Sequence, residues 1–259
     1  MSEIVQAYPT YAKHPDDDFA KNGYCRYVID QGDATSLIEQ GHNIVSSGKL
    51  IREPKDAGAL KVDKSTLKTN SKYYAELLAN TGLFRAVQED VKSLVFPRKI
   101  SHLVNDEATK TLIWHRDSYQ HNGTQIGPLP SPLKLAVYLT DVDEYSSVTG
   151  INPLFPNIDF NNRYIDIMLA YLLKPFAIYH RLSAGTAILF DGKLMHCRPK
   201  HRKGDYRQVI IFSLSQDPGQ LPTIEAIPTE LFGMLHALMV SAPEYERRIL
   251  EILKPKAEM

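Results

Sequence analysis

Strict alternation of hydrophobic and polar residues marks strands in the second half of the chain, most clearly over residues 133–143. One face of this segment carries Leu133, Leu135, Val137 and Leu139, and the other carries Lys134, Ala136, Tyr138 and Thr140. Because successive strand residues point to opposite faces, we expect the leucine-rich face to cover a core. Lys134 and Tyr138 then face either the mouth of a barrel or solvent. Shorter strand patterns occupy residues 24–29, 98–104, 109–114, 177–179, 186–190 and 207–212.

Apolar residues at intervals of three and four predict helices elsewhere. The predicted helices span residues 33–47, two segments within 71–94, 157–175 and two short segments within 228–253. In the 157–175 helix, which Pro175 ends, the spacing predicts a buried face made of Ile165, Met168, Leu169 and Leu172. We expect this helix to be an insertion between barrel strands, acting as a lid or as a dimer contact.

Two short connections complete the predicted layout. Residues 105–107 (Asn-Asp-Glu) predict a turn, so that 98–104 and 109–114 would pair as neighbouring strands. The stretch 48–65 is rich in Lys, Asp, Gly and Pro and predicts a loop. The pattern as a whole predicts a mostly β fold with flanking helices, in which residues 19–259 form one domain after a polar extension over 1–18.

The composition narrows the classes of function. The chain has 259 residues, 43% of them hydrophobic, which is enough for one sizeable core. Its 30 basic and 30 acidic residues cancel, so no overall field favours nucleic acid or an anionic membrane. The basic run 198–203 is either a solvated loop between strands or a phosphate-binding patch. Two cysteines and the lack of an apolar leader or span predict a reduced, cytoplasmic protein, with monomer and homodimer both open.

The candidate chemistry begins at Trp114-His115-Arg116-Asp117. On an extended strand, residues i and i+2 point to the same side, so His115 and Asp117 can bind one metal while the residue between them points away. His196 supplies a third ligand from a distant strand. Two imidazoles and one carboxylate form the facial triad of non-haem Fe(II) oxygenases, which leaves coordination positions open.

Single members of this set are weak evidence, because the chain has nine histidines. His102, for example, is expected to be an ordinary strand histidine, since no second ligand shares its face. The ordered set is stronger, because each of its members follows a strand pattern. Alternation also places Arg207 on the side of its strand that faces the same interior, and Arg198 two residues after His196 is a weaker candidate for an anion contact.

At these residues the chain resembles the Fe(II)- and 2-oxoglutarate-dependent dioxygenases, and within them the phytanoyl-CoA hydroxylase-like group. The resemblance rests on His115, Asp117, His196 and Arg207, on the turn and strand from Gly185 to Asp191, and on FAKNGYCRYVI at residues 19–29. It departs at 143–150, where that group often has an acidic-Asn-Gly turn.

The resemblance implies a distorted double-stranded β-helix, the jelly-roll or cupin-like core. It also implies Fe(II) held by the two histidines and Asp117, with 2-oxoglutarate and O₂ as cosubstrates. Arg207 would hold the distal carboxylate of 2-oxoglutarate, with Lys134, Tyr138 and Arg198 as further contacts. Tyr119 and His121, in the polar loop 118–132, either line the substrate pocket or pack that loop. The expected substrate is a small molecule such as an amino acid or a biosynthetic intermediate.

The sequence also bears on three other classes of protein. His115-Arg116-Asp117 followed by Asn122 has the spacing of a protein-kinase catalytic loop, but the first 114 residues contain no glycine-rich phosphate loop. A related halogenase would have a small residue where Asp117 stands. A non-catalytic metal- or ligand-binding barrel of the same fold is the alternative to an enzyme, and the intact set of ligand types favours the enzyme.

Overall fold

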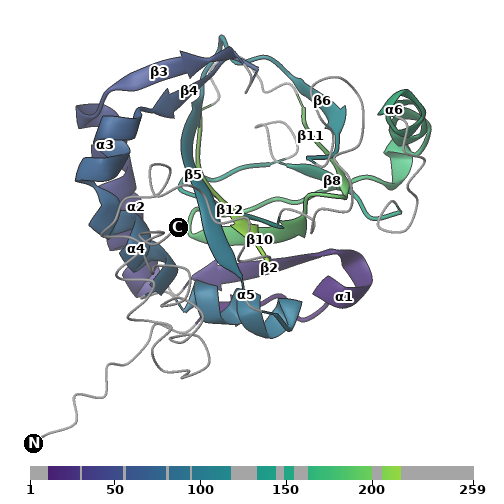
Figure 1. Ribbon diagram of the computed structural model, residues 1–259, viewed down its shortest axis with the longest axis horizontal. Coiled ribbons are helices and arrows are strands. Elements are labelled where there is room, and N and C mark those ends of the chain that lie inside the picture. Colours follow the sequence, from purple (N-terminus) through teal and green to yellow (C-terminus); the bar gives the residue numbers. More distant parts are fainter. Residues whose placement is uncertain are drawn as a thin grey trace, which may run out of the picture.

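The computed structural model describes residues 11–29, 31–54, 57–79, 82–93, 95–117, 133–143, 149–154, 163–199 and 206–216. Two antiparallel sheets face each other and form a distorted double-stranded β-helix (Figure 1). The predicted class, a β core with flanking helices, is confirmed. The predicted loop 118–132, with Tyr119 and His121, and the predicted C-terminal helices 228–253 lie outside the described residues.

The larger sheet has eight strands. Their order across the sheet is β1 (Tyr11–Lys13), β2 (Tyr24–Ile29), β10 (Thr186–Asp191), β7 (Leu133–Tyr138), β12 (Arg207–Ser215), β5 (Phe96–Asn105), β4 (Ala59–Val62) and β3 (Leu50–Glu53). The four-stranded sheet has the order β6 (Leu112–His115), β11 (Met195–Arg198), β8 (Gly150–Asn152) and β9 (Ile178–Tyr179). In the centre of the larger sheet, neighbouring strands from β2 to β5 are far apart in sequence, because the chain passes repeatedly between the two sheets.

Helices cover the outer face of the eight-stranded sheet. They are α1 (Phe19–Asn22), α2 (Gln31–Ser47), α3 (Lys64–Thr69), α4 (Ser71–Ala79) and α5 (Leu83–Val91). The leucine-rich face of β7 packs with α2, α4 and α5 in the largest hydrophobic cluster, as its alternation predicts. On the opposite side of the molecule, α6 (Arg163–Leu172) and the short 3₁₀ helix η2 (Lys174–Phe176) are inserted between β8 and β9 (Figure 1).

The structure corrects the predicted pairing of residues 98–104 with 109–114. The turn near Asp106 forms, but β5 pairs with β12 and β4, whereas β6 crosses to the other sheet and pairs with β11. The prediction was wrong because a turn between two strand patterns favours a hairpin, yet long-range partners fill both edges of β5.

The predicted loop over 48–65 is also wrong, since β3 and β4 form a hairpin there. Both strands are short and carry charged residues, which is typical of a protected sheet edge and hides the strand signal. At the opposite edge, Tyr11–Lys13 of the expected extension forms β1. None of the described helices has the length and apolar character that a membrane crossing requires.

The predicted buried face of the 157–175 helix is likewise corrected. Met168 is 56% exposed and Leu172 is 66% exposed, whereas Asp166 and Ala170 are buried. The helix is rotated because Asp166 makes a buried ion pair with Arg116, described below. The ion pair of Asp166, and not the spacing of the apolar residues, therefore determines which face of α6 is covered.

Candidate metal centre

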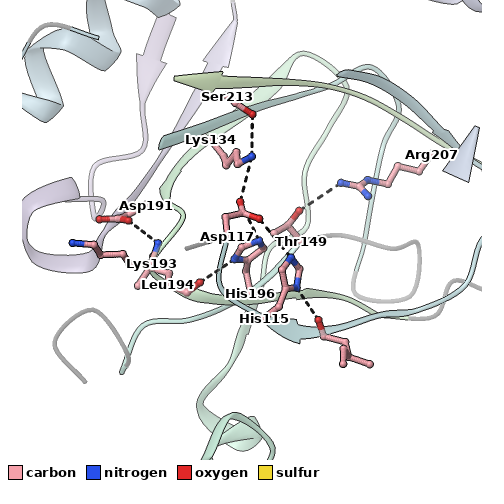
Figure 2. Close-up of polar contacts among 11 residues, drawn as sticks. His115, Asp117, Lys134, Thr149, Asp191, Lys193, Leu194, His196, Arg207 and Ser213 are labelled. Atoms are coloured by element: carbon pink, nitrogen blue, oxygen red, sulfur yellow. Dashed lines mark hydrogen bonds and ion pairs between the residues drawn. The ribbon is translucent and has the colours of Figure 1, made fainter. Parts of the chain in front are cut away.

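Three potential ligands converge where β6 and β11 pair. His115 and His196 are directly opposite each other in the two strands, and Asp117 follows two residues after His115. Ligand atoms of the three side chains all lie within 4.8 Å of one another. His115 Nε2 is 3.7 Å from Asp117 Oδ1, and His196 Nε2 is 3.7 Å from Asp117 Oδ2 (Figure 2). The three side chains therefore converge as the sequence predicts, although β6 ends at His115 and Asp117 lies in the turn that follows.

Backbone carbonyls fix the orientation of both imidazoles. His115 Nδ1 lies 2.8 Å from the carbonyl oxygen of Ile113, and His196 Nδ1 lies 2.9 Å from that of Leu194. A carbonyl oxygen only accepts, so each Nδ1 carries the proton and donates it. Each Nε2 consequently has a free lone pair directed toward Asp117, which is the tautomer that binds a metal through Nε2.

The protonation states also suit a cation. Burial, together with the neighbouring His115, lowers the pKa of His196 to about 4, so its imidazole is neutral at pH 7. Burial by itself would raise the pKa of Asp117, but Lys134 and the two histidines outweigh it and hold that pKa at about 2. The site thus offers the neutral imidazole of His196 and the carboxylate of Asp117 beside His115.

A buried ion pair, on the side away from the ligands, holds the segment that carries His115 and Asp117. Arg116 points away from the ligands, and its Nε lies 3.0 Å from Asp166 Oδ2 of α6, with the side chains 3% and 0% exposed. Its Nη1 donates to the carbonyl oxygen of Lys193 at 2.8 Å, in the turn that leads to His196. The backbone N–H of Asp117 donates to Gly192 in the same turn. Arg116 therefore connects both ligand-bearing segments to α6.

The ligands line an open cavity of about 140 Å³ between the two sheets. Its floor and walls include Leu112, Phe190 and Ile211 among apolar residues, and Lys99, Lys134, Arg198 and Arg207 among cations. Lys134 Nζ is 3.3 Å from Asp117 Oδ2 and donates to Ser213 Oγ at 2.9 Å (Figure 2).

Arg207 lies in the cavity wall and is only 4% exposed. Its Nη2 donates to Tyr138 Oη at 3.4 Å and to Thr149 Oγ1 at 3.5 Å, and its guanidinium carbon lies 5.1 Å from the Tyr138 ring centroid. Its Nε has no hydrogen-bond partner, and no carboxylate of the described residues lies within ion-pair distance of the guanidinium. A buried guanidinium with only neutral partners is suited to an anionic ligand.

The remaining predicted contacts have different surroundings. Tyr138 is buried, and its hydroxyl donates to Thr149 Oγ1 at 2.9 Å, so it supports Arg207 from behind. Arg198 lines the cavity and donates to Asn105 Oδ1 and to the Lys110 carbonyl oxygen.

His102 is an ordinary core histidine, as predicted. It lies between the hydroxyl of Tyr74 and the side-chain amide of Gln208, each within 2.9 Å, and burial lowers its pKa to about 3. It does not line the cavity.

Sequence reasoning missed Lys99, Thr149 and Ser213, which all line the cavity. Lys99 and Ser213 resemble solvent-facing strand residues, and only the sheet register brings them beside Lys134. Thr149 lies in the 143–150 segment where the chain departs from the family it resembles, and no motif marks it.

No protein-family model and no curated protein sequence matches the chain. Solved structures do match. The epimerase SnoN from nogalamycin biosynthesis, in complex with Fe³⁺ and alpha ketoglutarate, is 14% identical, with 76% of this chain and 80% of that chain covered and a TM-score of 0.59. HygX from Streptomyces hygroscopicus, with nickel, 2-oxoglutarate and hygromycin B bound, is 15% identical, with 77% and 85% covered and a TM-score of 0.60.

EctD from S. alaskensis with bound Fe is also similar, at 15% identity with 81% and 87% covered and a TM-score of 0.61. At these identities the comparison concerns the fold. The chain has the fold of non-haem, 2-oxoglutarate-dependent enzymes and carries a candidate His-x-Asp…His triad at the place where its two sheets open.

Proposed function

We propose that the protein is an Fe(II)- and 2-oxoglutarate-dependent oxygenase that oxidises an unactivated C–H bond of a small molecule, with hydroxylation as the expected outcome. The observation that carries this proposal is the convergence of His115, Asp117 and His196 at a cavity that also contains the buried Arg207. The fold of the similar enzymes supports it.

The donor set fits Fe(II). His115 and His196 would each bind through Nε2, since each Nδ1 donates to a carbonyl, and Asp117 would bind through a carboxylate oxygen. Two imidazoles and one carboxylate leave the cavity side of the metal for other ligands. When bound, the iron with 2-oxoglutarate and O₂ supplies the oxidising power, with release of succinate and CO₂.

Arg207 would bind the distal carboxylate of 2-oxoglutarate. Its planar guanidinium can form two parallel hydrogen bonds with a carboxylate, and its present partners are the neutral hydroxyls of Tyr138 and Thr149. Thr149 Oγ1 lines the cavity and is placed to donate to the same carboxylate. Tyr138 would keep the guanidinium in position. Arg198, held by Asn105, would contribute positive charge to the same wall.

The concave site, in which a few charged groups lie among apolar side chains, favours a small-molecule substrate. Tyr119 and His121 follow Asp117 closely in the chain, and we propose them as substrate contacts. The apolar wall that contains Leu112 and Phe190 would exclude water from the reacting bond.

Anaerobic titration of the purified chain with Fe(II) and 2-oxoglutarate tests the proposal. We expect the weak visible charge-transfer band of an iron-chelated keto acid, and we expect His115→Ala to remove it. His42→Gln is the control, because His42 lies outside the cavity lining, where its Nε2 is 3.0 Å from the Leu139 carbonyl oxygen. A wild-type protein that binds iron without developing the band would favour the non-catalytic binding barrel.

A further inference from the structure

A row of three polar side chains crosses the eight-stranded sheet at the open end of the cavity. Ser213 of β12 is directly opposite Lys99 of β5 on one side and Lys134 of β7 on the other. Residues paired in this way project from the same face of a sheet, and all three line the cavity. We name them the Lys99–Ser213–Lys134 row.

The row is separate from the position of Arg207. Ser213 lies six positions after Arg207 on β12, which is roughly 20 Å along an extended strand. Arg207 is buried, whereas Lys99 is exposed and Lys134 and Ser213 are partly exposed. The row therefore marks the mouth of the cavity and Arg207 its deep end.

The candidate metal ligands lie beside the row. Lys134 Nζ is 3.3 Å from Asp117 Oδ2. A 2-oxoglutarate that extends from the metal toward Arg207 occupies the deep side, so the row faces the side by which a substrate enters. When Asp117 shares its charge with a divalent cation, its attraction for Lys134 weakens.

The charges around the cavity favour an anion at this end. Among the described lining residues Asp117 is the one carboxylate, whereas four side chains are cationic. In the row, Ser213 lies between the two lysines in the sheet register and its hydroxyl accepts from Lys134 Nζ, and a hydroxyl and two ammonium groups can each donate a hydrogen bond to one oxyanion. Phe190 and Ile211 provide apolar surface nearby.

We infer that the Lys99–Ser213–Lys134 row binds a carboxylate or phosphate group of the substrate, so that the enzyme acts on a small organic acid. This inference rests on the proposed function, because it takes the deep end of the cavity as the position of 2-oxoglutarate. Lysine ammonium groups are compact point charges, so the row would recognise the charge of an oxyanion rather than its planar geometry.

The test uses full-length protein loaded with Zn(II) and 2-oxoglutarate, which cannot turn over. Benzoate and inorganic phosphate are titrated separately by calorimetry. We expect saturable binding of at least one probe to the wild type, and about fivefold weaker binding in Lys99→Met and in Lys134→Met, because each variant loses one charge contact that is exposed or partly exposed. Lys61→Met is the matched control, since Lys61 lies on β4 of the same sheet and outside the cavity lining.

Three results would overturn the inference. They are a wild type that binds neither probe, row variants that bind the probes as the wild type does, and a Lys61→Met variant that loses as much affinity as they do. Thermal unfolding of each variant verifies that it is folded, and Ser213→Ala, which leaves both charges in place, is expected to weaken binding less than either lysine variant.

A separate titration with 2-oxoglutarate shows whether the row binds the substrate or the cosubstrate. We expect Lys99→Met, which leaves the Lys134–Asp117 contact in place, to bind 2-oxoglutarate as the wild type does in the presence of Zn(II). Weaker 2-oxoglutarate binding with unchanged probe binding would assign the row to the cosubstrate and overturn the substrate class. A wild type that binds the probes but no 2-oxoglutarate would contradict the proposed function while leaving the oxyanion site in place.

Discussion

The two sheets contribute different chemistry to one cavity. His115 and His196 lie on paired strands of the four-stranded sheet, and Asp117 directly follows one of them. Lys99, Lys134 and Arg207 come from three neighbouring strands of the eight-stranded sheet. The first group is suited to a cation and the second to anions. Arg198 on β11 is the exception to this division.

The sheets also differ in what stabilises them. Helices and a large hydrophobic cluster cover the outer face of the eight-stranded sheet, whereas the four-stranded sheet packs with α6 around the small cluster of Trp114, Ala170, Met195 and Cys197. The ligand segment therefore depends more on specific polar contacts, such as Arg116 with Asp166, than on buried apolar area. We expect substitutions in the two sheets to separate metal binding from anion binding.

The largest effect is expected from the ligands themselves. Asp117→Ala or His196→Ala should weaken Fe(II) binding by more than about 100-fold and abolish turnover, because each removes a direct metal ligand. Iron titration and thermal unfolding measure affinity and fold. Normal activity in both variants would refute the assignment of the site.

Arg207→Ala should have the opposite selectivity and weaken 2-oxoglutarate binding instead of metal binding. It should raise the 2-oxoglutarate requirement by about 30-fold or more, the cost of removing one partner of a buried charge pair, with Fe(II) affinity unchanged. Binding of both ligands is measured anaerobically, with Lys61→Met as the control for the loss of a cation from the same sheet. A variant whose iron affinity falls while its 2-oxoglutarate affinity stays normal would contradict the division between the sheets.

Asp166→Asn should affect metal binding at the four-stranded sheet, although Asp166 lies on the side of that sheet away from the ligands. We expect about tenfold weaker metal binding and unchanged 2-oxoglutarate binding to metal-saturated protein, because Arg116 would no longer hold the ligand segment against α6. Asp17→Asn, which breaks the Asp17–Arg26 ion pair elsewhere, is the matched control.

Loss of stability could imitate this effect, so a double variant is needed. Replacing both partners, Arg116→Met with Asp166→Leu, should restore the free energy of unfolding without restoring metal affinity. Recovery of both properties would show that the ion pair acts through stability and does not position the ligands.

The smallest effect is expected where Arg52 of the edge strand β3 pairs with Asp106. Hydrogen bonds from Arg52 hold the pKa of Asp106 at about 2. Because that pKa is lowered on folding, the ion pair stabilises the protein above pH 4 and its contribution is lost as the pH falls toward 2. Both side chains are partly exposed, so the contribution is about 1 kcal/mol or less.

Urea unfolding at pH 7 and pH 3 measures this contribution. We expect Asp106→Asn to lower the free energy of unfolding at pH 7 and to leave a smaller difference between the two pH values. Equal pH dependence in wild type and variant would show that the ion pair does not stabilise this edge.

The sequence by itself was enough to predict the elements with strong hydrophobic periodicity and the three potential ligands, His115, Asp117 and His196. The alternation of 133–139 predicted the correct core face, because it depends on local backbone geometry. The His-x-Asp spacing predicted that Asp117 lies beside His115, although Asp117 follows the end of β6 and its backbone N–H donates to Gly192. The interpretation of His102 as an ordinary strand histidine was also correct. It was based on the lack of a second potential ligand on the same face of its strand.

Only the tertiary structure decided which strands are neighbours and which polar groups meet. It separated β5 from β6, paired Ser213 with Lys99 and Lys134, and turned α6 so that Asp166 reaches Arg116. These contacts join segments far apart in sequence, so no local pattern encodes them. Short charged edge strands such as β3 and β4 escaped prediction because their stability comes from the neighbouring strand and not from their own residues.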